Sequence, residues 1–367
     1  MTTGAVADRP GVRHLAALAQ RPRPAGGAFE RDARAHASRT LEQLGFVVHG
    51  EAFEYSAFPG RYATPVGGGL FALSTVLACR LALTGAGMGA VAVMLVSGVA
   101  ATVLFARWML RVGVLDFPLL RTEGVNLAAV RGEGMPRVWL VAHLDSKSQP
   151  IPSVARVLGI VLLVFALVLA IAGAALTLAG DPSRMIWWGV LIVATTGVLP
   201  VLASVVGSRS DGAVDNASGV AAVLAATALL PRDVAFGVLL TSAEELGMAG
   251  ARAWARRHPP SVALNCDGVD DEGDLVIMYN RRMPARVVNA VRDASARSAR
   301  VFRMPLGLLT DSSALADAGW SAVTVSHGSL ATLRRVHTTR DSLAYMTGTS
   351  VDEVSIILAR AAEALAS

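Results

Sequence analysis

The sequence has few of the residues that mark a disulfide-stapled or a nucleic-acid-binding protein. It contains only two cysteines, Cys79 and Cys266, so no disulfide framework is available and oxidising surroundings are not required. Lys147 is the single lysine, and the arginines are scattered instead of forming a basic stripe, so we expect no nucleic-acid partner despite the net charge of +5. Residues 1–30 contain no long apolar core, and a cleaved signal peptide is not expected.

Charge is missing from two long blocks of the chain. Charged residues make up 17% of the sequence, against about 25% in ordinary soluble domains. The block 63–106 has one charge, Arg80, and as a single helix it would be about 66 Å long, twice the thickness of a bilayer core. It therefore predicts a helical hairpin. The block 157–207 predicts a second hairpin, because its two uncharged runs flank the turn Asp181-Pro182-Ser183-Arg184.

The two hairpins predict an integral membrane protein with four spans in the lipid bilayer, and the alternative is a pair of buried core helices. The soluble remainder then comprises residues 1–62, 107–156 and 208–367. No ionisable residue lies in the middle of a span, which favours an anchor over an ion pathway. Arginines gather beside the outer ends of the hairpins, so the positive-inside rule predicts a cytoplasmic soluble part. They are Arg61, Arg107, Arg111, Arg156 and Arg209, whereas the turns hold only Arg80 and Arg184.

The soluble remainder alternates between strand and helix patterns. The apolar runs 125–131 and 137–143 flank Gly132-Glu133-Gly134, which predicts a β-hairpin. Alternation of strands with helices predicts an α/β layered domain with a largely parallel or mixed sheet. The predicted helices cover 31–44, 219–230, 248–258 and 351–366, and the other predicted strands cover 46–49, 234–241, 262–266 and 321–326.

Side chains suited to metal chemistry lie next to three of these elements. His143 ends a strand and Asp145 follows it, which suits a metal ligand and the group that orients it, although a histidine at a strand end is also a common structural residue. Asp215 lies in a glycine-bounded loop before a helix, where it could bridge two cations or cap the helix. Glu244 and Glu245 end another strand; one could bind metal while the other moves a proton, or both could be solvated.

Two further candidates complete the set. Asp267 closes the strand pattern Val-Ala-Leu-Asn-Cys-Asp, and His337 lies in Val-His-Thr-Thr-Arg-Asp-Ser. A single imidazole or carboxylate near a strand end often occurs by chance. Five of them in such positions in one chain are much less expected by chance. A ligand set without thiolate favours zinc, with cobalt or manganese possible.

In this order the motifs AHLDS, GAVDNASG, SAEELG, LNCDG and VHTTRDSL resemble the M28 family of zinc aminopeptidases, and the resemblance covers nearly all of the soluble chain. It implies a three-layer α/β/α sandwich around a mixed sheet. It also implies that Glu244 is the general base and that the Asp145 carboxylate orients His143. The implied ligands of two zinc ions are His143 and Asp267 on one, Glu245 and His337 on the other, and Asp215 as the bridge.

The chain departs from the family in the spacing of its first two motifs, because the second hairpin separates His143 from Asp215. If both residues meet at one site, the chain between them crosses the bilayer an even number of times, and two spans satisfy this. We therefore expect a membrane-anchored dinuclear zinc aminopeptidase that acts on peptide substrates. Loops 278–283 and 304–310 are expected to line its substrate pocket.

The alternative functions are a carboxypeptidase or glutaminyl-cyclase-like activity and a non-catalytic, metal-binding membrane scaffold. Glutaminyl cyclases resemble this family but work with one zinc ion, so a complete set of five ligands disfavours them. An intact Glu244 and intact ligand positions disfavour the scaffold. No feature of the sequence indicates an oligomeric state.

Overall fold

The computed structural model describes residues 9–305 and 307–367, which form two compact units. The α/β unit contains the chain up to Tyr55, Arg121–Ser148 and the chain from Ser208 onward. The helical unit contains Ser56–Leu120 and Gln149–Gly207. The helical unit is therefore built from two insertions into the α/β unit, and the chain passes between the units four times.

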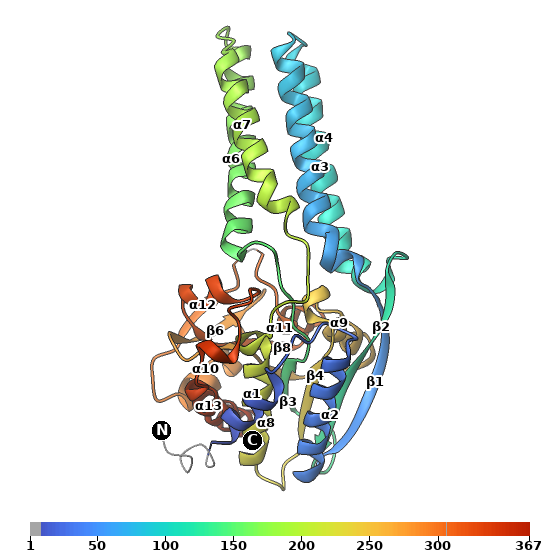
Figure 1. The fold of residues 1–367 in the computed structure, drawn as a ribbon, viewed down its shortest axis with the longest axis vertical. Helices are drawn as coiled ribbons and strands as arrows, with labels where there is room; N and C mark the ends of the chain where they lie inside the picture. Colours follow the sequence, from blue (N-terminus) through green and yellow to red (C-terminus); the bar gives the residue numbers. More distant parts are fainter. Residues whose placement is uncertain (1–8, 306) are drawn as a thin grey trace. The chain divides into compact units, whose positions relative to one another are not determined.

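A mixed sheet forms the centre of the α/β unit (Figure 1). In the described part of the chain it has eight strands in the order β1-β2-β4-β3-β5-β8-β6-β7. β4, β3, β5 and β8 run parallel to one another, whereas β2 and β6 run antiparallel to their neighbours β4 and β8. The strands are β1 (Val47–Ser56), β2 (Arg121–Arg131), β3 (Val138–His143), β4 (Phe236–Thr241), β5 (Val262–Val269), β6 (Asp274–Tyr279), β7 (Arg300–Arg303) and β8 (Ser321–Gly328).

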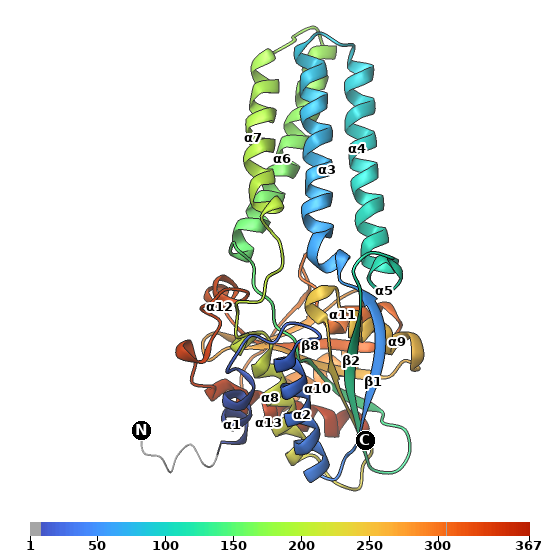
Figure 2. The same ribbon diagram turned by 45° about the vertical axis from the view of Figure 1, so that its right-hand side comes forward.

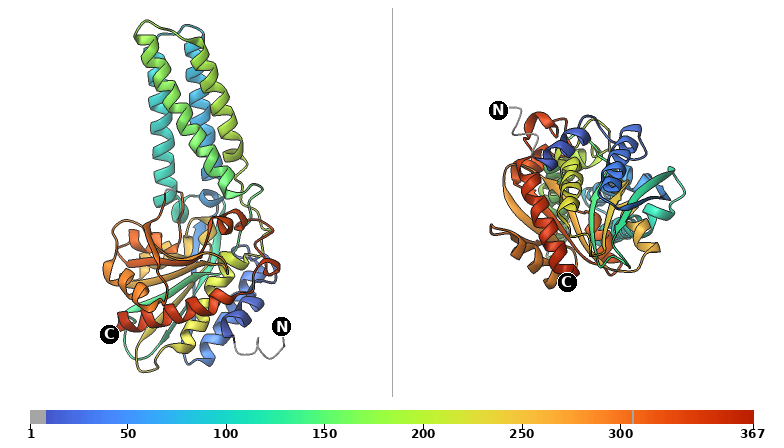
Figure 3. Two further views of the ribbon diagram at one scale, coloured as in Figure 1. Left: turned by 90° about the vertical axis from the view of Figure 1, so that its left-hand side faces the viewer. Right: turned by 90° about the horizontal axis from the view of Figure 1, so that it is seen from below.

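Alternate residues of the central strands face two separate cores, because successive side chains of a strand point to opposite faces. Leu140 and Ala142 of β3 belong to one core, and Trp139 and Val141 belong to the other. Helices cover both faces (Figure 3), which confirms the expected three-layer α/β/α sandwich. The first core includes α1 (Pro10–Leu18), α2 (Ala28–Gln43), α8 (Gly219–Leu229), α10 (Ala285–Ala294) and α13 (Thr349–Ala366), and the second includes α9 (Ala249–Arg257) and α11 (Asp311–Asp317).

The predicted hairpin of 125–131 and 137–143 is wrong. β2 and β3 follow each other in the chain, but β4 lies between them and pairs with both. Val238 of β4 is the register partner of Ala129 in β2 and of Leu140 in β3. The turn after β2 therefore passes across a strand that comes from a much later part of the chain, which a local pattern cannot reveal. The sequence patterns also missed β6 and β7.

The helical unit consists of two helical hairpins whose helices lie side by side (Figure 2). The first starts at Phe58 instead of the predicted Ala63, and Phe58 packs on Phe117 with ring centroids 4.9 Å apart. The sequence left two places open for its turn, Arg80 and Gly85-Ala86-Gly87, and the structure has the second, because α3 continues past Arg80 to Leu83. The hairpins are α3 (Phe58–Leu83) with α4 (Met88–Trp108), and α6 (Ser153–Leu178) with α7 (Arg184–Leu202); η1 (Met109–Gly113) and α5 (Val114–Asp116) continue α4.

These four helices are long and apolar enough to cross a membrane. They also leave large apolar side chains uncovered within the unit. Val93 is 69% exposed, Leu104 is 67% exposed and Ile192 is 63% exposed. Apolar surface of this extent on a soluble protein is rare without something that covers it.

Close helix contact in the second hairpin depends on two glycines. A Cβ atom placed on Gly159 of α6 would lie 2.7 Å from the carbonyl oxygen of Gly197 in α7 and 2.7 Å from Cγ of Pro200. A Cβ on Gly197 would in turn lie 2.9 Å from the Gly159 carbonyl oxygen. Small residues at such crossings let helix backbones approach closely.

We predict that Gly159→Val destabilises the purified protein by about 1–3 kcal/mol, because the added atoms force α6 away from α7. Gly189→Val is the matched control, since nothing lies within 4 Å of a Cβ placed on Gly189 of the same hairpin. The thermal unfolding temperature in detergent measures both variants. An equal fall of the unfolding temperature in both variants would mean that the close crossing of α6 and α7 does not contribute to stability.

Candidate metal centre

Three neighbouring parallel strands end at the same edge of the sheet. β4, β3 and β5 are adjacent and parallel, so their carboxyl ends meet there, as at ligand sites in other open α/β sheets. His143 is the last residue of β3. Glu244 and Glu245 follow β4 in η3 (Glu244–Leu246), and Asp267 lies near the end of β5. The sheet topology therefore gathers these four side chains from three motifs.

The other two candidate ligands come from loops. Asp215 lies in η2 (Ala213–Ser218), just before α8, and His337 follows α12 (Leu330–Arg335). The carboxylate of Asp341 accepts hydrogen bonds from the backbone N–H groups of Val214 (2.6 Å) and Asp215 (3.2 Å), which ties the two loops together. His337 has a φ of +65°, a left-handed conformation that costs a non-glycine residue energy and is common at functional sites.

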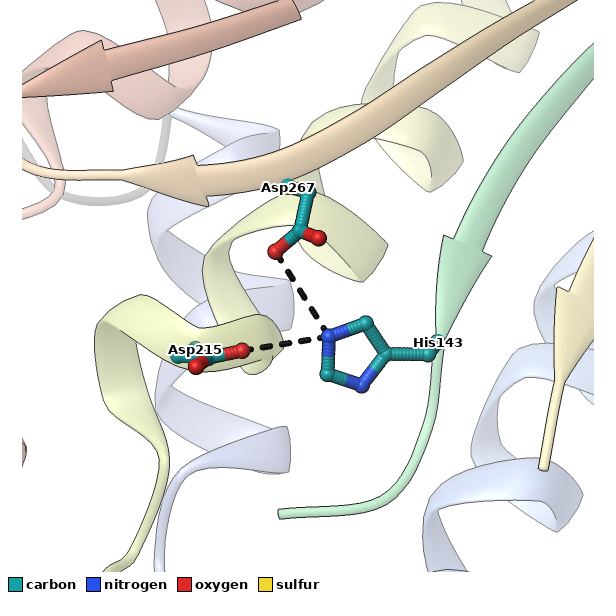
Figure 4. A group of neighbouring side chains, drawn as sticks. All are labelled: His143, Asp215 and Asp267. Carbon is teal, nitrogen blue, oxygen red and sulfur yellow. Dashed lines mark ion pairs between the residues drawn. The ribbon is translucent and has the colours of Figure 1, made fainter. Parts of the chain in front are cut away.

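The candidate ligands form two clusters that share Asp215. In the first, Nε2 of His143 lies 3.1 Å from Oδ1 of Asp215 and 3.5 Å from Oδ1 of Asp267 (Figure 4). In the second, Nε2 of His337 lies 2.8 Å from Oδ2 of Asp215 and 3.6 Å from Oε1 of Glu245. Each oxygen of Asp215 therefore faces a different histidine.

These spacings fit a divalent cation in each cluster. Zinc bonds of about 2.0–2.2 Å to nitrogen and oxygen put two ligands of a tetrahedral ion about 3.4 Å apart. Nε2 of His143 and Oε1 of Glu245 are buried and make no hydrogen bond with any residue that the structure describes. Buried polar atoms normally have a partner, and a metal ion would supply one here.

The electrostatics of the clusters also fit cations. Burial raises the pKa of Glu244 well above its usual value, and the charges of Glu245 and Asp267 raise it further against the lowering effect of His143. Burial lowers the pKa of His143, but the charges of Asp267 and Glu244 and the neighbouring carboxylates of Asp145 and Asp215 outweigh it and raise the pKa well above its usual value. Without a metal, protons therefore offset the excess negative charge of this site.

Asp145 contacts both sides of the site. Nδ1 of His143 lies 3.0 Å from the backbone oxygen of Asp145 and 3.6 Å from its Oδ1. A carbonyl oxygen only accepts hydrogen bonds, so Nδ1 carries the proton and leaves Nε2 for a metal. The Asp145 carboxylate accepts hydrogen bonds from the backbone N–H groups of Glu244 (3.1 Å) and Glu245 (3.2 Å). Its carbonyl is thus the hydrogen-bond acceptor that orients His143, whereas the resemblance implied its carboxylate, and the carboxylate holds the loop of the two glutamates.

Lys147 is a residue of this site that the sequence analysis did not assign. Its Nζ forms an ion pair with Oε2 of Glu245, on the oxygen that does not face His337. Burial lowers the pKa of Lys147, but the charges of Glu245, Glu244 and Asp215 raise it above the usual value. Its sequence signal was available, because the single lysine of the chain stands two residues after Asp145.

The two loops expected to line a substrate pocket lie against each other. The backbone N–H of Met304 donates to the carbonyl of Tyr279 (2.9 Å), and Nε of Arg303 donates to the carbonyl of Asn280 (3.0 Å). The expected loop 304–310 includes Leu306, which lies outside the described residues. Their role in a pocket stays a prediction.

Glu30 supports the glutamate loop from the N-terminal part of the chain. It is 1% exposed, and it accepts hydrogen bonds from the Ser242 hydroxyl and from the Gly26 backbone N–H (2.7 Å). Burial and the nearby charge of Asp145 raise the pKa of Glu30 to about 7. Ser242 lies two residues before Glu244, so Glu30 holds the start of that loop.

Known proteins are similar to this chain in sequence pattern and in fold. The model of peptidase family M28 matches residues 126–362, whereas none of the curated proteins matches the chain. Similar solved structures include an aminopeptidase from Aneurinibacillus sp. strain AM-1, with 14% identity, a TM-score of 0.56 and coverage of 96% of this chain and 92% of that one. A zinc aminopeptidase from Bacillus subtilis has 12% identity, a TM-score of 0.54 and coverage of 96% and 93%. A glutaminyl cyclase from Porphyromonas gingivalis has 13% identity, a TM-score of 0.54 and coverage of 96% of both chains.

We predict that Asp215→Asn binds less metal than the wild type, because a neutral amide with one oxygen cannot serve both clusters. Metal content per chain, measured after dialysis against trace zinc, checks this. Asp274→Asn is the control, since Asp274 is exposed at the start of β6. Full metal content in Asp215→Asn would contradict the role of Asp215 as the ligand shared by both clusters.

We predict that metal-free protein loses stability as the pH rises from 5 to 8, in part through Glu30. The folded-state pKa of about 7 lies above the usual 4.5, so the folded state binds the extra proton. The extra proton contributes roughly 3 kcal/mol to the free energy of unfolding. This contribution is fully present below about pH 4.5, and it disappears as the pH rises through 7. Glu30→Gln should flatten the dependence of the unfolding temperature on pH, and Glu363→Gln, an exposed change on α13, should keep the wild-type slope.

Proposed function

The chain belongs to peptidase family M28, and from this premise we propose that it is a membrane-anchored, zinc-dependent aminopeptidase. The observation that carries the proposal is the pair of ligand clusters joined by Asp215, with Glu244 beside them. Oε2 of Glu244 lies 4.0 Å from Nε2 of His143, so the carboxylate is next to the clusters without belonging to either. A carboxylate in this place suits a general base.

Five residues would hold two zinc ions. The ions would polarise the peptide carbonyl and make a water molecule acidic near neutral pH, which is the established chemistry of two-metal hydrolases. The donor set of imidazoles and carboxylates supports zinc, with cobalt or manganese as possible replacements. The proposed ligands are His143, Asp215, Glu245, Asp267 and His337.

Glu244 performs the proton transfers of the proposed reaction. Its carboxylate takes a proton from the water that attacks the carbonyl carbon, and it then gives this proton to the amine nitrogen as the C–N bond breaks. Asp145 holds the backbone of Glu244 in place. Lys147 occupies the outer oxygen of Glu245, which leaves Oε1 for the metal.

Removal of N-terminal residues is the favoured specificity. The aminopeptidases from Aneurinibacillus and Bacillus subtilis have the same fold, and the motifs of this chain resemble zinc aminopeptidases. The glutaminyl cyclase from Porphyromonas gingivalis has this fold too. The two clusters favour the aminopeptidase, because the cyclase reaction is expected to need one ion.

The helical unit is proposed to be the membrane anchor. The length of its four helices and their exposed apolar side chains support this. Each hairpin crosses the bilayer twice, so all segments of the α/β unit stay on one side. The arginines near the outer hairpin ends support a cytoplasmic position, which protease protection in sealed vesicles checks.

We predict that Glu244→Gln lowers the release of N-terminal amino acids at least about 100-fold, the usual scale for a lost general base. Its zinc content should stay close to the wild-type value, because Glu244 belongs to neither ligand cluster. The assay uses detergent-purified full-length protein and a mixed peptide library, with and without chelator.

Zinc-restorable release by the wild type alone supports a metalloaminopeptidase and identifies its preferred first residue. A variant that keeps more than a tenth of the wild-type rate removes Glu244 from the role of base. Ammonia from peptides with N-terminal glutamine, without release of amino acids, would instead support a glutaminyl cyclase.

A further inference from the structure

Arg23 is an arginine in the interior of the α/β unit, outside the part of the chain that matches the family model. It follows α1, and it is 2% exposed. A buried guanidinium is costly unless its N–H groups have partners. The position of those partners therefore indicates what Arg23 does.

The guanidinium of Arg23 donates to backbone carbonyls of three separate segments. Nε donates to Leu144 (2.9 Å), in the segment that follows β3. Nη1 donates to Asp211 (2.6 Å) and Nη2 to Gly212 (3.0 Å), both in the loop that leads to Asp215. Nη1 also donates to Leu18 at the end of α1 (2.8 Å).

Two of these segments carry the proposed metal ligands. Leu144 stands between His143 and Asp145, and Gly212 stands three residues before Asp215. Along the chain the two segments are separated by the whole second hairpin, α6 with α7. The spacing of the two segments therefore depends on this hairpin and on the contacts inside the α/β unit that join the segments directly.

Two serines reinforce the same junction. Ser146 accepts a hydrogen bond from the backbone N–H of Arg23 (2.9 Å) and donates one to the carbonyl of Ser210 (3.1 Å). Ser148 accepts a hydrogen bond from the backbone N–H of Arg209 (2.9 Å). Within this group, Arg23 contacts both ligand-bearing segments through one planar guanidinium.

The residue type suits this position. The guanidinium has five N–H donors in a fixed plane, whereas a lysine ammonium has three on a flexible chain. Burial lowers the pKa of Arg23, and the charges of Asp341, Asp145 and Asp215 oppose that effect. The cation therefore also offsets part of the negative charge of the metal site.

We propose that Arg23 is a positioning residue of the metal site, which fixes the distance between the His143 segment and the Asp215 segment on either side of the membrane insertion. The inference rests on the proposed function only in that the two clusters bind zinc. It assigns a role to an N-terminal residue that neither coordinates the ions nor touches the substrate.

The test compares zinc affinity and stability in Arg23→Met, Arg23→Lys and Arg131→Met, all as full-length protein in detergent. Arg131 is a matched control because it is 8% exposed and also donates to backbone carbonyls, those of Leu44, Leu230 and Pro231. It lies beside Phe236, at the end of β4 opposite to Glu244. Competition with a chromophoric chelator gives the zinc dissociation constants, and unfolding temperatures are measured with chelator present.

Arg23→Met should weaken zinc binding at least about tenfold, as loss of a partner behind metal ligands commonly does. Arg23→Met and Arg131→Met should lower the unfolding temperature by similar amounts, because each removes a buried guanidinium. Arg131→Met should nevertheless keep the zinc dissociation constant within about twofold of the wild-type value. Arg23→Lys keeps the charge and part of the hydrogen bonding, so its zinc affinity should lie between wild type and Arg23→Met.

Zinc affinity of both Arg23 variants within twofold of wild type would overturn the proposal, as would equal weakening in Arg131→Met. If Arg23→Met does not fold, the affinity of Arg23→Lys decides. A wild-type protein that binds no zinc would also overturn it. A wild type that binds zinc tightly without releasing amino acids contradicts the proposed function alone, because the comparison of affinities needs no turnover.

Discussion

Four carboxylates meet two imidazoles at the carboxyl edge of the sheet, and the rest of the α/β unit has to make that arrangement stable. Burial of so many negative charges is unfavourable unless cations or protons offset them. The shifted pKa values of Glu244 and His143 show this electrostatic demand in the absence of metal. Lys147 and Arg23 add positive charge around the clusters without filling the ligand positions. A pair of divalent cations would complete the balance.

Carboxylates that accept backbone N–H groups hold two of the loops that carry these side chains. The carboxylates of Asp145 and Asp341 each accept two backbone N–H groups, and they hold the glutamate loop and the Asp215 loop respectively. Glu30 fixes the start of the glutamate loop through Ser242. Carboxylates that grip the backbone position a ligand without competing with it for the metal. The candidate site is thus surrounded by a second set of charged residues with a structural role.

A helical hairpin is inserted between two ligand-bearing segments, so the chain itself does not keep these segments next to each other. The residues around His143 and those around Asp215 are joined along the chain only through the segment that contains α6 and α7. Hydrogen bonds donated by Arg23 and Ser146, and one accepted by Ser148 from the backbone N–H of Arg209, join the two segments inside the α/β unit. The same contacts explain how a domain can accept a helical insertion between two of its ligand-bearing segments and keep the geometry of that site.

The sequence by itself determined which segments form long apolar helices, which fold class forms and which side chains could bind metal. Charge-free runs, alternation of strands with helices, and ligand types near strand ends are local features that the chain displays in order. Only the tertiary structure decided that β4 enters between β2 and β3, and that Arg23 and Glu30 reach the site. Strand order and buried hydrogen bonds join residues far apart in the chain, and such pairings leave no periodic mark in the sequence around either partner.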